Sequence, residues 1–166
     1  MALCDIAVSY GEAGQKEKAS KILSQALQLA KRLKPCDLPC MVLRDISRGY
    51  AKIGEYDKAI EIANTIRGST SPGFDSLYWP KALCDIAVSH EEAGQKEKAS
   101  KILSRALQLA KTVKDIEYKA EALRDIAGSY AKVGQYDKAL EVAKTCLLYT
   151  SPSPRDLSTS RMPSSA

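Results

Sequence analysis

The sequence repeats itself along its length. Residues 2–34 return almost unchanged as residues 82–114, with 28 of 33 positions identical, and a weaker version of the same segment begins midway between the two copies. The result is four units at a 40-residue step, aligned on Leu3, Leu43, Leu83 and Leu123. Repeats of this length bury their apolar faces only by stacking on their neighbours. The sequence therefore predicts an array of stacked units and not one closed globule.

The fourth unit shows most clearly what each unit folds into. Asp115 can cap a helix that Gly134 ends, and a second helix starts near Tyr136. The apolar residues of the first helix follow the i, i+3, i+4, i+7 rule and are Ala122, Leu123, Ile126, Ala127 and Tyr130. Each unit is predicted to be an antiparallel helical hairpin. The chain is then all-α, a right-handed α-solenoid of four hairpins.

Two small residues recur at fixed places in every unit. A glycine marks the turn between the helices, where positive φ is needed: Gly14, Gly54, Gly94 and Gly134. Five residues later an alanine allows the paired helices to approach closely: Ala19, Ala59, Ala99 and Ala139. A larger side chain at the alanine position is expected to overpack at a cost of about 1 to 3 kcal/mol.

The units are expected at about residues 1–34, 36–68, 75–114 and 115–145. The second helix is predicted to be long in units one and three (residues 15–33 and 95–113) and to stop near Arg67 in unit two. Residues 68–73, Gly-Ser-Thr-Ser-Pro-Gly, are predicted to form a loop.

An aromatic cluster follows this loop, made of Phe74, Leu77, Tyr78 and Trp79. It is predicted to pack as the start of the first helix of unit three, with Pro80 in the first turn. The alternative is that part of the cluster forms an exposed recognition surface.

The last 21 residues, 146–166, break the helical pattern. Residues 146–156 and 160–166 resemble translations of two adapters used in short-read sequencing libraries, in the expected order and frame. The alternative is a native, disordered Ser/Pro tail. We predict a non-native, disordered tail and exclude it from the fold. We expect the natural protein to continue past Thr145. Met1 stands where unit three has Lys81, so the chain is expected to be an internal piece of a longer protein.

Composition argues against several functional classes. The formal net charge is +5, but charges of both signs alternate along the helices, which favours solvated faces over a nucleic-acid footprint. No apolar run approaches the roughly 20 residues of a membrane span. Cys4 and Cys84 lie on different units, and Cys36 and Cys40 have no histidine nearby, so neither disulfides nor a metal site are predicted. Reduced thiols in the cytoplasm are expected.

Catalytic constellations are missing from residues 2–145. No nucleophile with its base, metal cluster or phosphate-binding loop is recognisable there, so the chain is predicted not to be an enzyme and to carry no cofactor. His90, the only histidine, replaces the tyrosine of the other units and is predicted to be a packed or edge residue.

The repeated residues resemble the tetratricopeptide repeat signature. The matching positions are Leu123, Ile126, Ala127, Tyr130, Gly134, Tyr136 and Ala139 in unit four, and Leu3, Ile6, Ala7, Tyr10, Gly14 and Ala19 in unit one. The match covers nearly all of residues 2–145. The chain departs from the family where the second helix usually carries a large aromatic, in lacking the terminal proline, and in its step of 40 against the usual 34 residues.

The resemblance implies that the first helices line a concave groove. It places these candidate ligand-binding residues there: Asp5, Arg44, Asp45, Arg48, Asp85, Arg124 and Asp125. The groove positions that it picks out also include Cys84 and Gly128. Either the four aspartates and the arginines receive a charged peptide, or each aspartate pairs with a basic residue of a neighbouring first helix and fixes the stacking. The second hypothesis is favoured, at about 0 to 1 kcal/mol per pair. Relatives that clamp the acidic tail of heat-shock chaperones use Lys and Asn at these positions, which argues against that partner.

Three functions stay open. The favoured one is a protein-interaction scaffold that binds a peptide or partner helix, of unknown identity, in the groove. The second is an RNA-binding array, because Tyr-Ala-Lys-Val-Gly-Gln-Tyr-Asp-Lys-Ala at residues 130–139 also resembles the pentatricopeptide repeat. The third is the regulatory array of a larger enzyme or signalling protein. Self-association through uncapped ends is also expected.

Overall fold

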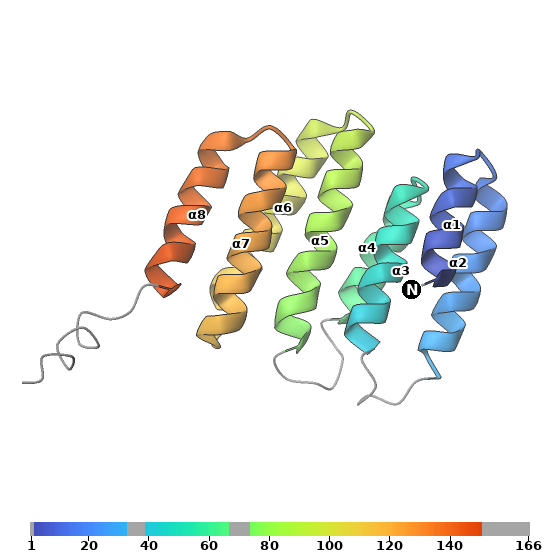
Figure 1. Ribbon diagram of the computed structural model, residues 1–166, viewed down its shortest axis with the longest axis horizontal. Coiled ribbons are helices and arrows are strands. Elements are labelled where there is room, and N and C mark those ends of the chain that lie inside the picture. The colour runs from blue at the N-terminus through green and yellow to red at the C-terminus, as the bar shows by residue number, and fades with distance from the viewer. Residues whose placement is uncertain (1, 33–38, 67–73, 151–166) are drawn as a thin grey trace, which may run out of the picture.

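The computed structural model describes residues 2–32, 39–66 and 74–150, and these ranges contain eight α-helices and no strand. The helices are α1 (Ala2–Glu12), α2 (Lys16–Ala30), α3 (Pro39–Lys52), α4 (Tyr56–Ile66), α5 (Phe74–Glu92), α6 (Lys96–Thr112), α7 (Ile116–Lys132) and α8 (Tyr136–Thr150). Each odd-numbered helix pairs antiparallel with the helix that follows it (Figure 1). The prediction of an all-helical array of four hairpins is confirmed.

The same short turn closes all four hairpins. Its glycine has a φ between 74° and 85° in every unit, which an L side chain rarely adopts. In unit three the N–H of Gly94 donates to the carbonyl of Glu91 at 2.8 Å, and that of Gln95 donates to His90 at 2.8 Å. This pair of bonds is the Schellman motif, which satisfies carbonyls left open at a helix end. At the other end of a helix, the Asp115 carboxylate accepts hydrogen bonds from two backbone N–H groups, as predicted for a cap.

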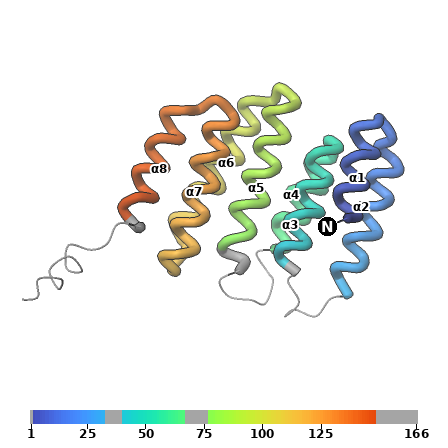
Figure 2. Tube along the Cα trace, viewed as in Figure 1, coloured from blue at the N-terminus to red at the C-terminus, as the bar shows by residue number. Residues whose placement is uncertain are grey.

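The hairpins stack through their first helices. Contacts join α1 to α3, α3 to α5 and α5 to α7, and each second helix also contacts the first helix of the next unit. Among the described residues, second helices do not contact one another, and the first and last hairpins do not meet. The array is therefore open, with its hairpins side by side in chain order (Figures 1 and 2). Its right-handed sense stays a prediction.

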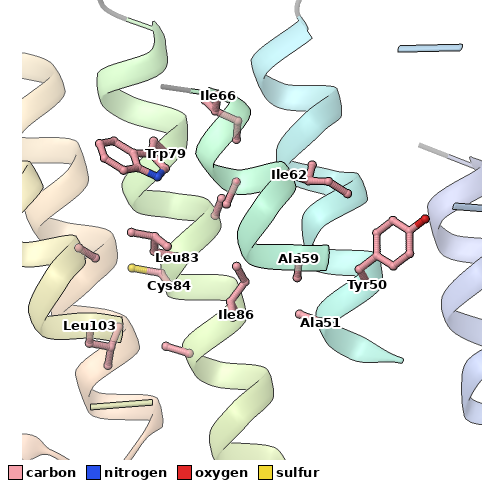
Figure 3. Close-up of a cluster of buried hydrophobic side chains, with 14 of the residues drawn as sticks. Tyr50, Ala51, Ala59, Ile62, Ile66, Trp79, Leu83, Cys84, Ile86 and Leu103 are labelled. Atoms are coloured by element: carbon pink, nitrogen blue, oxygen red, sulfur yellow. The ribbon is translucent and has the colours of Figure 1, made fainter. Parts of the chain in front are cut away.

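The hydrophobic core runs along the array and does not close around one centre. The four alanines that follow the turns are buried, as predicted. Between units two and three, Ile66 of α4 and Leu83 and Ile86 of α5 belong to one buried cluster (Figure 3). At each boundary between units, two neighbouring hairpins therefore share part of the hydrophobic core.

The start of α5 differs in part from the prediction. Leu77 and Trp79 are buried, so the packing hypothesis is confirmed for them against the exposed alternative. The helix begins at Phe74, however, and Pro80 lies inside it, beyond the first turn. Burial of Leu77 and Trp79 offsets the roughly 3 kcal/mol that an interior proline costs. The predicted loop at residues 68–73 lies outside the described residues.

The end of α8 also differs. The helix runs to Thr150, so residues 146–150, assigned above to a disordered tail, continue the helix. Cys146 falls seven residues after Ala139 on the same helix face, and its thiol donates to the carbonyl of Ala120 at 3.2 Å. The predicted break in the helical pattern at Cys146 was wrong, because Cys146 lies in register with the buried face of α8. The remaining tail, residues 151–166, lies outside the described residues, and its adapter origin stays a prediction.

Candidate functional site

Side chains of the first helices of units two to four line a hollow of about 380 Å³. Arg44 of α3, Asp85 of α5, and Arg124 and Asp125 of α7 all line it, so the structure brings four of the seven predicted groove residues together. The other three, Asp5 on α1 and Asp45 and Arg48 on α3, lie outside its lining.

An ion pair crosses the hollow between units two and three. Arg44 Nε lies 2.9 Å from Asp85 Oδ2, and the two side chains are 25% and 23% exposed. Burial alone would lower the pKa of Arg44, but the Asp85 carboxylate outweighs it and the pKa lies above its ordinary value. On the same two helices, Lys52 Nζ lies 2.6 Å from Glu92 Oε2. These contacts fix how α5 sits on α3.

Between units three and four, a lysine forms the ion pairs that join the two first helices. Lys81 Nζ of α5 lies 2.6 Å from Glu121 Oε1 and 3.3 Å from Asp125 Oδ2 of α7. Burial would lower the pKa of Lys81, but the hydrogen bond to Glu121 and the charge of Asp125 raise it above its ordinary value. Asp85 and Asp125 are thus each paired with a basic residue of the preceding first helix. At these two boundaries the geometry agrees with the stacking hypothesis.

The boundary between units one and two is built differently. Cys4 occupies the register of Arg44 there, and Met1 that of Lys81. Asp45 Oδ1 lies 3.9 Å from Arg48 on its own helix, and Asp5 is exposed.

Two exposed cations stand at the unit-four side of the hollow. The Arg124 side chain is 70% exposed and only loosely placed, 3.8 Å from Glu121 and 4.0 Å from Asp125. Lys132 is exposed on the same helix and also lines the hollow. Gly128 lies between them, and a Cβ there would meet no atom within 4 Å. We call Arg124 and Lys132 the cationic rim.

Sequence reasoning missed three residues of the hollow: Lys81, Ser129 and Lys132. Lys81 lies three residues before Cys84, and Lys132 four residues after Gly128, so each is one helical turn from a predicted groove position. The i, i+3 and i, i+4 spacing was the signal that could have found both lysines.

The remaining chemistry of the groove is inert. Burial raises the pKa of the Cys84 thiol to about 12, so at neutral pH it is neither a nucleophile nor a metal ligand. Within residues 2–32, 39–66 and 74–150, no three His, Cys, Asp or Glu side chains are placed to hold a metal ion. Over the same ranges no helix combines the length and apolarity of a membrane span.

His90 is a packed residue, as predicted. Its ring stacks on Tyr56 with centroids 3.8 Å apart, and its Nδ1 lies 3.0 Å from Gln95 Oε1. Burial lowers its pKa below the ordinary value, which favours the neutral ring. His90 borders a second hollow of about 550 Å³ between α4 and α6, whose lining includes Lys98 and Lys101.

Comparisons with known proteins bear on the fold. The family profile described as tetratricopeptide repeat matches residues 2–32 and 80–112, the first and third hairpins. No curated protein matches the chain significantly. Two solved structures are similar, both of TPR-like repeats from a Podosopora anserina protein assigned as a kinesin light chain. The first, a point variant of that protein, is 18% identical with a TM-score of 0.47, over 96% of this chain and 76% of that one. The second is 16% identical with a TM-score of 0.36, over 97% and 96%.

Repeats of this type are generally protein-binding and typically non-catalytic. The four Schellman-closed hairpins and the profile match together support one assignment. The first and third hairpins match the tetratricopeptide repeat family, and the described chain is an array of helical hairpins that resembles such repeats.

Proposed function

We propose that this chain is an interaction scaffold whose groove binds a peptide segment or partner helix that carries acidic side chains. The observation that supports the proposal is the contrast of charges in the hollow. The carboxylates of Asp85 and Asp125 are engaged by Arg44 and Lys81, whereas the rim residue Arg124 extends into solvent. The charge left for a partner is positive.

The physics of such a site sets what the partner must supply. An exposed guanidinium binds a carboxylate through parallel hydrogen bonds, but each exposed pair contributes only about 0.2 to 1 kcal/mol. A partner therefore needs several carboxylates in sequence, or apolar residues between them. Association should weaken as salt rises, because exposed charges are screened.

The proposal includes a cytoplasmic location for the array. The buried residues Cys4 and Cys84 are free thiols. Thiols persist in reducing compartments, where disulfides are rare.

A peptide-display selection against the whole chain tests the function. We expect acidic peptides to be recovered, and their dissociation constants to be measured by fluorescence anisotropy. The double variant R124E/K132E should weaken binding by at least about tenfold, since two contacts are lost and two repulsions added. The matched control is R105E/K111E, an equal charge change at two exposed positions of α6 away from the hollow.

Two results would contradict the proposal. Selected peptides that bind R124E/K132E as tightly as the wild type would place the site elsewhere. Recovery of no peptide, together with salt-dependent binding of single-stranded RNA, would favour the nucleic-acid function instead.

A further inference from the structure

The boundary between units two and three departs from its neighbours on the side of the second helices. At the boundaries before and after it, a tyrosine of the first helix shares a hydrogen bond with a serine of the preceding second helix: Tyr50 with Ser24 at 2.9 Å, and Tyr130 with Ser104 at 3.4 Å. Unit three has His90 at this register. The histidine ring is shorter than a tyrosine, and Tyr56 of α4 stacks on it instead.

The hollow of about 550 Å³ lies at this boundary. Among the described residues, α4 and α6 neither contact one another nor share a hydrogen bond or ion pair. Both helices give the hollow apolar side chains, Ile60 and Ile102, which are half-buried. Ile60 stands where units one and three have Ser20 and Ser100, so the apolar lining is specific to this boundary.

The charges of the hollow are divided between its two sides. On α6, Lys98 and Lys101 are exposed one helical turn apart, and neither forms an ion pair within the described part of the chain. On the α4 side, Glu55 Oε2 lies 2.6 Å from Lys58 Nζ, so these two charges compensate one another. The exposed carboxylate of Asp57 is left there. A partner therefore meets positive charge along α6 and negative charge at the start of α4.

We infer that the hollow between α4 and α6 binds an amphipathic helix of a partner protein. Its apolar side chains pack against Ile60 and Ile102, as in other complexes of a helix in a groove. Carboxylates one turn apart on such a helix match the spacing of Lys98 and Lys101. A basic residue on its other edge faces Asp57, so the charges also set the orientation of the helix.

This site goes beyond the proposed function because it is separate from the groove. The two hollows have no lining residue in common, and the cationic rim belongs to the other one. Each site can therefore be removed without changing the side chains of the other.

Peptide selection on the whole chain tests the inference. A display library of amphipathic helical peptides is selected on the wild type and counter-selected on K98E/K101E. The recovered peptides should carry acidic residues one turn apart and bind K98E/K101E at least about tenfold more weakly in fluorescence anisotropy, since two contacts are lost and two repulsions added. Peptides with lysine at those acidic positions should regain affinity for K98E/K101E, which also shows that this variant is folded.

The internal repeat supplies a matched control. K18E/K21E reverses the equivalent lysines of α2, which are exposed and lie in the same local sequence, Lys-Ala-Ser-Lys. It should bind the selected peptides as tightly as the wild type. The variant R124E/K132E should also bind them normally, which separates this site from the groove.

His90 reports where the peptide binds, because it is the only histidine of the chain. Its imidazole NMR signal should shift when a selected peptide is added to the wild type or to R124E/K132E. An unmoved signal would overturn the inference, as would recovery of no peptide that discriminates against K98E/K101E. Equal binding of a peptide with a proline at its centre would also overturn it, because the occupant would then not be a helix. None of these results bears on the groove, which has its own test.

Discussion

A matched pair of core truncations tests whether stability is transmitted only between neighbouring hairpins. Leu23 on α2 and Leu103 on α6 are both fully buried and lie in nearly identical sequence, in units one and three. Leu23 packs across a boundary: a Cβ added to Gly49 of α3 would lie 2.6 Å from its Cδ2. Leu23→Ala and Leu103→Ala therefore make the same chemical change at the end and in the interior of the array.

The local cost of the two changes should be similar. Each removes three carbons, worth about 0.8 kcal/mol apiece in transfer free energy, and the cavity left behind brings the total to about 2.7 to 5 kcal/mol. A domain has only about 5 to 15 kcal/mol of stability, so this loss is enough to open one hairpin. The consequences differ because unit one has one neighbour and unit three has two.

Hydrogen exchange read by mass spectrometry distinguishes the outcomes. Leu23→Ala should speed exchange in α1 and α2 and leave α5 to α8 protected. Leu103→Ala should speed exchange in α5 to α8 together, because α7 and α8 lose the face on which they stack. Uniform loss of protection in both variants would refute the reasoning, since the array would then unfold as one cooperative block. In the Leu103→Ala variant, a loss of protection confined to α5 and α6 would also refute the reasoning, because unit four would then keep its stability without an intact unit three.

Three shorter predictions concern single features. Gly94→Ala should cost about 1 to 2 kcal/mol of unfolding free energy in urea, because its φ is +75°, whereas Gly128→Ala in the open part of α7 should add up to about 1 kcal/mol. A double-mutant cycle on Arg44 and Asp85 should give a coupling energy of about 1 kcal/mol that falls in high salt; a coupling of zero would show that the pair does not fix the stacking. Cys84 should resist alkylation in the folded chain at pH 8. Its folded pKa of about 12 lies above the ordinary 9.0, so its contribution to stability is complete below pH 9 and is lost as pH rises toward 12, which urea unfolding across that range would detect.

The hairpin architecture could be predicted from the sequence because each of its determinants is local. The glycine turns, the Asp115 cap and the spacing of Ile126 and Tyr130 specify a helix pair without knowledge of any other unit. The 40-residue step then requires the pairs to stack. Element order, turns and buried alanines all follow from these signals.

The details that could not be predicted depend on contacts between units. In the sequence, Pro80 indicates the start of a helix. In the structure α5 begins before Pro80, because residues that precede it are buried. Cys146 reads as the start of a foreign segment, yet it completes a buried face of α8. The Asp125 partner could have been any cation within a turn of Cys84, and only the relative placement of α5 and α7 selects Lys81.

The alternation of unit types links the groove to the ends of the array. The two near-identical units, one and three, are followed by boundaries of one kind by sequence, although only the boundary after unit three has the lysine that pairs across it. They alternate with a second kind, seen after unit two, where Arg44 and Lys52 cross to the next unit. Unit four ends the described array with Arg124 and Lys132 at those same registers, so its cations are the first half of a boundary of the second kind. They are also the cationic rim of the groove. Side chains at these registers pair with carboxylates at the boundary between units two and three, so an acidic peptide is the kind of partner that the rim is suited to bind.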